Sequence, residues 1–576
     1  MTESPPFDRD HMLGRLRHEQ FDVLVVGGGI TGVGVALDAA SRGLRTALVE
    51  RDDFAAGTSS KSSKLVHGGL RYLQQGEVRL VYEALHERQR LRANAPHLVS
   101  VMPFMIPILG RPQRPGDTVV GKVGKAGDGA GDTKSVVNRK IARALGSAMW
   151  MYDLTGGWRI GKLHRRLRKD AALRHMPTMP GERVLSAYLY YDAAVDDARL
   201  VLAVARTAAA QGAVVVNRCG VVDVTRDGPG RVDGVVVSAD GEEIRIQARV
   251  VVNAAGVWSD RVRALDEGAD PNSIRPAKGV HLTVPWHKVR NDIAVVIPVP
   301  KDKRSLFVVP WGPLGDGTFR HTYVGTTDTE HHGSLDDPQC TADDIAYVLR
   351  ALNASVTTDV TVDDVTGVWA GLRPLVNTSA SGRTADLSRR HSIVRNPDGL
   401  ITVTGGKLTT YRQMAEDTVD QVMSELGRTG RCRTKRMHLV GADRHRPTPG
   451  TTEAHLHGRH GALAEAIASL ARTEPSLGEP LVEGLPYLRA EAVYAVRHEM
   501  ATTLDDVLSR RTRARMLDRD ATVGAAPAVA ILIGAELGWD DVRRATEVAA
   551  FRSSCADEAA AGMVPAAEVE SIEGLT

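Results

Sequence analysis

The chain contains 576 residues, 43% of them hydrophobic, and its 73 basic and 70 acidic side chains leave a formal net charge of +3. This length exceeds what one hydrophobic core organises, so we expect about two to four domains. The near balance of charge argues against a general affinity for nucleic acid. The cysteines lie far apart, without a CxxC pair, at Cys219, Cys340, Cys432 and Cys555. This pattern suggests neither a disulfide framework nor a zinc site, predicts no metal, and fits a reducing cytosol.

Residues 1–20 are polar and charged and lack the apolar core of a signal peptide. We predict that they form a short tail. Farther along the chain, no stretch approaches the roughly 18 uninterrupted apolar residues of a membrane span. The sequence therefore predicts a protein that does not cross a bilayer.

The first predicted element is a buried strand at Phe21–Val26, followed by a glycine-rich turn and an alanine-rich helical pattern at Val33–Arg42. A second apolar run, Leu44–Val49, ends in Glu50, at about the 20-residue spacing where an acidic side chain meets a ribose hydroxyl. The turn has GxGxxG spacing and comprises Gly27, Gly29, Ile30, Thr31 and Gly32. Glycines let the backbone approach a pyrophosphate, which the helix N-terminus attracts. This context favours a dinucleotide site over the alternative, a glycine-rich turn without a ligand.

A small polar loop follows Glu50 and leads into SSKLVHGGLRYL (residues 62–73), where a lysine, a histidine and an arginine surround adjacent glycines. Such a loop is suited to wrap a bound prosthetic group, whereas an NAD domain usually continues with further βα units. Later, Ala213–Val224 has a strand pattern, and a strand at Val250–Val252 runs into Asn253–Gly256. This arrangement is typical of a flavoprotein.

With these motifs the chain resembles the FAD-dependent glycerol-3-phosphate dehydrogenases, in the glutathione-reductase-like flavoprotein group that includes D-amino-acid oxidases. The similarity extends over nearly the whole length. The motif VVGGGITG is shared by many flavoproteins, but SSKLVHGGLRYL, GLRPL (371–375) and GGKLTTYR (405–412) are together highly specific. One departure is the glycine-rich, basic segment 111–138, which looks like an inserted flexible loop.

The resemblance implies an α/β fold in which a Rossmann-like FAD-binding domain carries an antiparallel β-sheet substrate domain and a C-terminal α-helical domain. We place the FAD-binding domain discontinuously at 21–98, 190–278 and 390–425, because its motifs recur along the chain. The substrate domain then comprises 99–189 and 279–389. Helical patterns assign 430–576 to the C-terminal domain.

The resemblance also implies FAD as cofactor and four substrate-binding residues, Arg71, Tyr72, Arg373 and Lys407. A phosphate monoester carries close to two negative charges, which arginine binds bidentately and lysine as a point charge. The expected cofactor contacts, besides the glycine-rich turn and Glu50, are Thr58, Ser59, Ser62, Ser63, Lys64, His67, Gly68, Gly69, Leu70, Val222, Ala255, Gly256, Gly406, Lys407, Leu408 and Thr409.

Oxidation of an alcohol requires a base that removes the hydroxyl proton while hydride leaves carbon for the flavin. His67 is one candidate for this base, and His281 in KGVHLTV is the other. A histidine beside glycines is also often only a hydrogen-bonded structural residue. For Asp196 and Asp197, which precede a helical pattern, we favour a capping role for one of them over a catalytic one.

The implied reaction is oxidation of sn-glycerol 3-phosphate to dihydroxyacetone phosphate, with electrons passed to a respiratory quinone. The alternatives are a glycerol-3-phosphate oxidase that uses O2 and a flavin-bound protein without turnover. The segment Arg139–Asp170 interleaves basic residues with Trp150, Met151 and Trp158, which suits an anionic membrane surface. A solvated helical region is the main alternative, and nucleic-acid binding is less favoured. We expect a cytoplasmic protein attached peripherally to the inner face of the cell membrane, with a homo-dimer as a further possibility.

Overall fold

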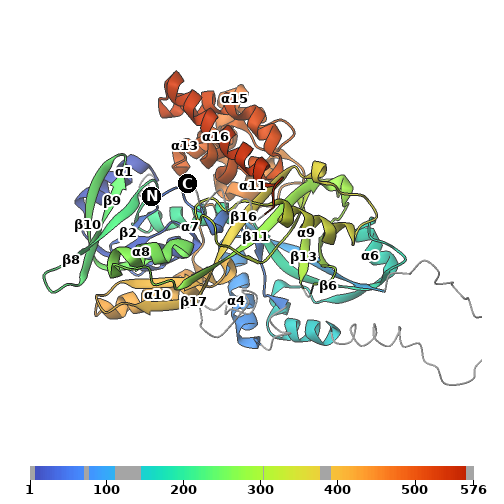
Figure 1. Ribbon diagram of the computed structural model, residues 1–576, viewed down its shortest axis with the longest axis horizontal. Coiled ribbons are helices and arrows are strands. Elements are labelled where there is room, and N and C mark those ends of the chain that lie inside the picture. The colour runs from blue at the N-terminus through green and yellow to red at the C-terminus, as the bar shows by residue number, and fades with distance from the viewer. Residues whose placement is uncertain (1–6, 71–76, 111–144, 303, 377–390, 566–576) are drawn as a thin grey trace, which may run out of the picture.

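The computed structural model describes residues 7–70, 77–110, 145–302, 304–376 and 391–565. Figure 1 shows three regions: a sheet with flanking helices, a second sheet beside it, and a cluster of helices formed by the C-terminal part of the chain. This arrangement confirms the predicted fold class. Two of the predicted substrate residues, Arg71 and Tyr72, and the glycine-rich segment 111–138 lie outside the described residues.

The first sheet has eight strands and a parallel centre, with the order β17-β18-β10-β1-β2-β7, while β8 and β9 form an antiparallel extension from β10. All six residues of β1 are buried, as expected for a parallel strand covered on both faces. Helix α2 packs against both α7 and α10 beside this sheet. The bounds are β1 Phe21–Val26, α2 Ile30–Ser41, β2 Thr46–Val49, α7 Asp197–Ala210, β7 Val214–Val216, β8 Gly220–Arg226, β9 Val232–Ala239, β10 Glu242–Asn253, α8 Ser259–Glu267, β17 His391–Arg395, β18 Ile401–Gly405 and α10 Tyr411–Glu425.

The second sheet has ten strands in the order β15-β11-β14-β13-β12-β4-β6-β3, with β16 on β11 and β5 on β6. Its pairs are antiparallel except β12 with β4. The bounds are β3 Leu65–Val66, α4 Val78–Asn94, β4 Val99–Leu109, β5 Arg165–Arg168, α6 Lys169–His175, β6 Val184–Val195, β11 Ile274–Pro285, β12 Ala294–Pro298, β13 Ser305–Pro313, β14 Phe319–Gly325, β15 Thr329–Glu330, α9 Ala342–Asn353 and β16 Gly367–Val376.

The predicted domain boundaries at 190 and 278 are wrong in detail. Both fall inside strands of the second sheet, β6 and β11, and β3, predicted in the FAD-binding part, pairs with β6. An alternating or continuous apolar run predicts a strand, but its pattern does not tell which of two adjoining sheets the strand will join.

The predicted N-terminal tail is also wrong, because Arg9–His18 forms helix α1. Asp8 caps this helix by accepting a hydrogen bond from the backbone N–H of His11. Met12, Leu13 and Leu16 are buried in the core of the first domain. Only these three apolar side chains mark a contact face in a segment that is otherwise charged, so composition alone hid the helix.

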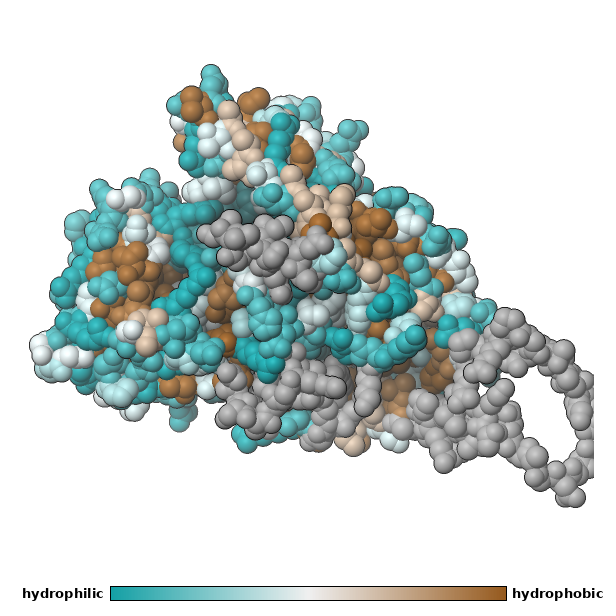
Figure 2. Space-filling view, in the orientation of Figure 1, coloured by the Kyte–Doolittle hydropathy of each residue, from teal (hydrophilic) through white to brown (hydrophobic). Residues whose placement is uncertain are grey.

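The C-terminal helices bury two apolar clusters of their own. Their bounds are α11 Thr452–His460, α12 Ala464–Thr473, α13 Arg489–Glu499, α14 Ala514–Leu517, α15 Arg519–Leu537 and α16 Asp541–Ala561. By length and composition alone, α15 is apolar enough to cross a membrane. It packs against α13, α14 and α16, however, and buries Val529 and Ile533 there. Figure 2 shows apolar and hydrophilic residues interspersed over these helices rather than a continuous apolar belt on this face. One face of α15 therefore packs in the core of this domain, and 33% of its apolar window is buried.

Candidate active site

The turn between β1 and α2 forms a cradle that only glycine fits. A Cβ atom at Gly32 would lie 1.9 Å from the carbonyl oxygen of Gly27, and one at Gly27 would lie 2.7 Å from that of Ala254. Gly27 also has a φ of +110°, which favours glycine. The N-cap of α2 is Gly29, which has no side chain to cap the helix, and the first turn of α2 contains no acidic residue. Backbone amides at this helix N-terminus therefore suit a pyrophosphate.

Glu50 follows β2 and lies beside this cradle. Its carboxylate accepts hydrogen bonds from the backbone N–H of Gly28 at 2.5 Å and of Asp52 at 2.8 Å. Burial raises the pKa of Glu50 to about 7, against the opposing effect of these two hydrogen bonds. Arg218 and Cys219 donate backbone hydrogen bonds to the carbonyl oxygens of Asp52 and Glu50. Strand β8 begins directly after Cys219 and carries Val222, which is 42% exposed.

The pKa of Glu50 predicts how cofactor affinity depends on pH. Hydroxyl donors from a ribose favour the ionised carboxylate of Glu50. Below pH 7, FAD binding should therefore release a proton from those protein molecules in which Glu50 is protonated. We expect the Kd of the apoprotein for FAD to fall as pH rises from about 6 to 8, by up to about tenfold per unit below the pKa. Flavin fluorescence titrations measure this, and Glu50→Gln should flatten the profile. An unchanged profile in Glu50→Gln would assign the proton to another group.

The loop after Glu50 uses two of its own side chains to bond to the backbone of two other segments. Ser59 Oγ accepts a hydrogen bond from the backbone N–H of Ile30 at 2.9 Å, next to Thr31. Thr58 Oγ1 donates to the carbonyl oxygen of Leu372 at 2.5 Å, beside Arg373 on β16. The predicted cofactor contacts Thr58 and Ser59 thus connect the glycine-rich turn to the GLRPL motif.

Ser62 and Lys64 use their side chains to support the loop. Ser62 Oγ donates to Asp197 Oδ2 at 2.7 Å, and Lys64 Nζ lies 3.2 Å from Asp197 Oδ1. Lys64 Nζ also lies 4.8 Å from the ring centroid of Trp369. Burial lowers the pKa of Lys64 to about 8, although the Asp197 carboxylate opposes this change. The structure therefore gives these two side chains a supporting role in the loop, and a direct cofactor contact at Ser62 and Lys64 stays a prediction.

His67 lies where the loop meets the GGKLTTYR motif. Its backbone N–H donates to Thr409 Oγ1 at 3.2 Å, and its ring centroid lies 6.4 Å from that of Phe307 on β13. Thr409 belongs to the short helical turn Leu408–Thr410, which Lys407 precedes after Gly406. The next residues of the loop are Gly68, whose N–H donates to Asp192, then Gly69 and Leu70. Segments more than 300 residues apart thus meet at the predicted site, as the hydrogen bond between His67 and Thr409 shows.

His281 occupies a different position from His67. It is 2% exposed, and its ring stacks on Trp369 with centroids 4.8 Å apart. Its Nε2 lies 2.9 Å from Ser63 Oγ. Burial, with further contributions from Lys64 and Arg373, holds the pKa of His281 well below its usual range. The imidazole is therefore neutral, its Nε2 contacts Ser63, and its buried Nδ1 makes no hydrogen bond to any described residue, so His281 and His67 both stay candidates for the base.

Arg373 is half-buried on β16. It donates to Asp328 Oδ1 at 3.0 Å and to the carbonyl oxygen of Thr327 at 3.1 Å. A Cβ atom at Gly279 on β11 would lie 2.5 Å from the guanidinium. The neighbouring strand therefore leaves room for this side chain because residue 279 is glycine. On the other side of the cradle, Ala255 donates its N–H to Asn253 Oδ1, and Gly256 has a φ of +62°.

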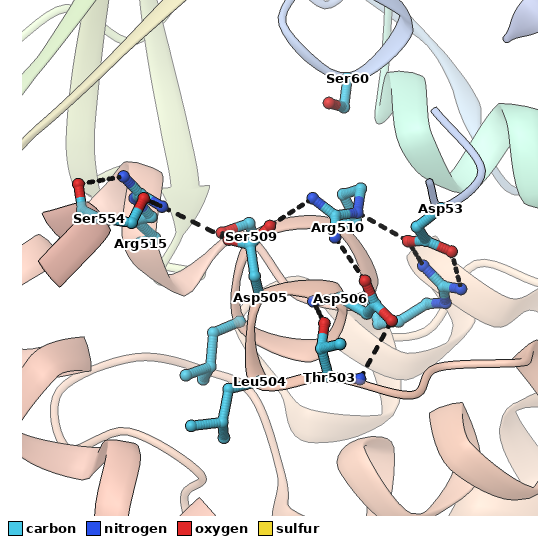
Figure 3. A network of polar contacts seen from close by, with 12 residues as sticks. Asp53, Ser60, Thr503, Leu504, Asp505, Asp506, Ser509, Arg510, Arg515 and Ser554 are labelled. Atoms are coloured by element: carbon cyan, nitrogen blue, oxygen red, sulfur yellow. Dashed lines mark hydrogen bonds and ion pairs between the residues drawn. The ribbon is translucent and has the colours of Figure 1, made fainter. Parts of the chain in front are cut away.

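The sequence analysis missed a set of charged contacts that fasten the C-terminal domain to the FAD-binding loop, shown around Arg510 in Figure 3. Asp53, fully buried, accepts from Arg510 Nε at 2.6 Å and from Arg511 Nη1 and Nη2 at 2.6 and 2.8 Å. Against the effect of burial, these arginines lower the pKa of Asp53. Arg513 contacts Asp196 at 3.0 Å and also Asp197. We call these residues, Asp53, Asp196, Asp197, Arg510, Arg511 and Arg513, the interdomain clamp.

Asp196 also confirms the expected capping role, because it accepts from the backbone N–H of Arg199 at the start of α7. Asp197 does more than the sequence predicted, since it bonds Ser62, Lys64 and Arg513 together. The one available signal was the basic run RRTR at 510–513, which lies in a stretch dense in both acidic and basic residues.

Comparison with known proteins agrees with this geometry. Residues 22–412 match the family model described as FAD dependent oxidoreductase, and residues 432–544 match the C-terminal domain of alpha-glycerophosphate oxidase. Glycerol-3-phosphate dehydrogenase 2 of Mycobacterium tuberculosis is 38% identical, over 93% of this chain and 88% of that protein. The chain belongs to the FAD-dependent glycerol-3-phosphate dehydrogenase family.

Other members of this family are similar over most of the chain. The human mitochondrial glycerol-3-phosphate dehydrogenase is 35% identical over 96% of this chain and 75% of its own length. The solved structure of the glycerol-3-phosphate dehydrogenase from Bacillus halodurans, complexed with FAD, has a TM-score of 0.72. It is 28% identical and covers 95% of this chain and 96% of its own. The cofactor of this family is FAD, and the glycine cradle, the uncapped helix α2 and Glu50 fit its dinucleotide part.

Proposed function

We propose that the protein oxidises sn-glycerol 3-phosphate to dihydroxyacetone phosphate and passes the electrons to a respiratory quinone at a membrane surface. The observation that carries this proposal is the meeting of three motifs around one loop. Thr58 bonds to Leu372, next to Arg373, and His67 bonds to Thr409, two residues after Lys407. The names of the relatives suggest glycerol 3-phosphate as the substrate. These contacts bring the two cationic residues, Arg373 and Lys407, close to the same loop.

The side chains of this site suit a phosphorylated alcohol. Arg373 offers a planar guanidinium and Lys407 a compact cation, which together match a phosphate of nearly two negative charges. Conversion of the C2 alcohol to a ketone removes one proton from oxygen and one hydride from carbon. His67, next to adjacent glycines at the same loop, is our candidate for the proton acceptor. FAD, when bound, supplies the hydride acceptor.

The acceptor of the electrons is testable directly. Anaerobic mixing of the purified, FAD-loaded protein with glycerol 3-phosphate should bleach the flavin absorbance, and a soluble quinone should then restore it. We expect quinone reduction to outpace peroxide formation in air by at least about tenfold, which corresponds to roughly 1.4 kcal/mol in barrier height. Stoichiometric peroxide with slow quinone reduction would favour the oxidase, whose name the C-terminal family model carries. Absence of bleaching would leave a flavin-bound protein without turnover.

A membrane-docking surface supports the quinone as acceptor. Five large apolar side chains are 46–76% exposed between residues 150 and 163, namely Trp150, Met151, Leu154, Trp158 and Leu163. The same stretch of the chain carries the basic residues Arg159, Lys162, Arg165, Arg166, Arg168 and Lys169, all exposed except the half-buried Arg159. Apolar side chains that enter a lipid interface beside cations that face anionic headgroups are the features of a peripheral membrane protein. We propose peripheral attachment at the cytoplasmic face through this surface; Arg139, Lys140 and Arg143 lie outside the described residues.

Charge reversal tests the docking surface. Arg165, Arg166 and Arg168 lie on β5, with exposed side chains on either side of the buried Leu167. Each cation near an anionic surface contributes about 1 kcal/mol at low salt. Replacing the three by Glu should therefore release the protein from anionic vesicles in sedimentation, while reduction of a soluble dye stays nearly unchanged. The matched control reverses Arg431, Arg433 and Arg436, which are also exposed. Equal loss of vesicle binding in both triple variants would show that net charge alone, and not this surface, governs attachment.

Light scattering of the same samples tests the predicted homo-dimer.

A further inference from the structure

We propose a divalent transition-metal site at Asp443, His445, Glu453 and His457, where the chain passes from the FAD-binding domain into the C-terminal helices. Asp443 and His445 lie in the connecting segment, and Glu453 and His457 lie one turn apart on α11. Residues four apart on a helix share a face. The four side chains thus offer two imidazoles and two carboxylates, a ligand set that suits Zn²⁺.

The distances between the ligand atoms match a tetrahedral ion. His445 Nε2 lies 3.1 Å from Glu453 Oε1, and His457 Nδ1 lies 3.5 Å from Asp443 Oδ2. The ligand atoms of His445, Glu453 and His457 all lie within 4.8 Å of one another. Zinc bonds of about 2.0–2.1 Å in tetrahedral geometry place neighbouring ligand atoms about 3.4 Å apart. Only a small contraction of this cluster, within the reach of side-chain rotation, would close it around one ion.

An independent observation points to a missing ligand at His457. Its Nδ1 atom is buried and makes no hydrogen bond to any described residue, because Asp443 Oδ2, 3.5 Å away, is too distant for a good one. A buried imidazole nitrogen without a hydrogen bond is costly unless something else satisfies it. The other histidines of α11 differ in this respect, because His455 and His460 both lie against Glu491, at 2.9 and 3.2 Å. The unsatisfied Nδ1 atom of His457 is therefore a feature of this cluster, and the other histidines of α11 do not share it.

The connecting segment is already positioned for such a site. Asp443 Oδ1 accepts from the backbone N–H of His445 at 2.9 Å, which leaves Oδ2 directed toward His457. Arg446 donates to the carbonyl oxygen of Pro96 at 2.5 Å and so joins the segment to the FAD-binding domain. A bound ion would tie this segment to α11. The sequence analysis predicted no metal, and this proposal departs from that prediction; the prediction rested on the cysteine pattern, and this site contains no cysteine.

The test uses full-length, untagged, FAD-loaded protein, stripped with a chelator and titrated with Zn²⁺ by calorimetry and with Co²⁺ by visible absorption. We expect one saturable Zn²⁺ site, tetrahedral Co²⁺ absorption bands, and a rise of a few °C in Tm at saturating Zn²⁺. His445→Ala/His457→Ala should weaken Zn²⁺ binding by at least about tenfold and abolish the Co²⁺ bands. His438→Ala, an exposed histidine of the same region, should behave as the parent.

Dye-linked turnover of glycerol 3-phosphate in the metal-free double variant shows that it is folded, because none of the four residues belongs to the active site. Equal Zn²⁺ affinity in the parent and the double variant would overturn the proposal. So would the absence of saturable binding by the parent up to about 100 μM Zn²⁺, a concentration at which even a weak site of this composition should fill.

Discussion

Arg373→Ala is expected to lower kcat/KM for glycerol 3-phosphate by about 30- to 900-fold, which corresponds to the roughly 2–4 kcal/mol of a charged hydrogen bond in a partly desolvated site. Lys407→Ala should have a similar effect, since both cations face the substrate phosphate in our proposal. Retention of FAD should change little in either variant. Steady-state kinetics with a soluble dye, beside the flavin-to-protein absorbance ratio, measure the two quantities separately.

Glycerol provides the internal control for this experiment because it lacks the phosphate. Its slow oxidation should decline much less than that of glycerol 3-phosphate in both variants. Arg275→Ala is the matched control variant, since Arg275 lies on the neighbouring strand β11 and pairs with Glu330 at 2.6 Å. Equal loss for both substrates would mean that Arg373 and Lys407 maintain the site in some other way than by binding phosphate.

Asp197→Ala should have the largest effect on stability, because it removes the carboxylate that contacts the buried Lys64 and one of the two that contact the buried Arg513. Lys64 is 4% exposed and the Arg513 side chain is fully buried. Removing one partner from a buried ion pair costs about 3–5 kcal/mol. We expect Tm to fall by roughly 10 °C and FAD to dissociate faster, since Ser62 and Lys64 lose their support together. Differential scanning fluorimetry and flavin release on dilution measure these effects.

Two further variants separate the role of Asp197 in cofactor binding from its role in folding. Asp197→Asn keeps much of the shape and removes the charge, so it should have an intermediate effect. Asp520→Ala removes an exposed carboxylate whose side chain is 86% accessible, and surface pairs of this kind contribute at most about 1 kcal/mol. Excess FAD should restore part of the lost Tm in Asp197→Ala. A Tm within about 1 °C of the parent would show that Asp197 does not hold the loop.

The interdomain clamp gives the C-terminal domain a direct connection to the cofactor site. Asp53 lies three residues after Glu50 and is held by Arg510 and Arg511, while Asp197 connects Arg513 with Ser62 and Lys64. Movement of the C-terminal helices would therefore move the loop that surrounds the flavin. Buried ion pairs are weak evidence for net stability, but breaking one is strongly destabilising. We infer that these contacts position the loop rather than contribute to catalysis themselves.

Local patterns were sufficient to predict the cofactor and the class of fold. Strand β1, the glycine-rich turn and Glu50 form one continuous unit, in which the short-range geometry of strand, turn and helix decides where a pyrophosphate can lie. The specific motifs around His67, Arg373 and Lys407 likewise indicated the family before any coordinate was known. Such features depend on residues close together in the chain, so their spacing alone carries the information.

Only the tertiary structure decided how the distant parts are joined. Whether β6 and β11 belong to one sheet or the other depends on pairing between strands far apart in sequence, and α1 forms because three apolar residues find a partner surface. The neutral state of His281 comes from its burial against Trp369, which its neighbours in the sequence do not reveal. The clamp is the clearest case: Asp53 and Arg511 are 458 residues apart. Each charge is ordinary in isolation, and burial beside its partner is what gives it a role.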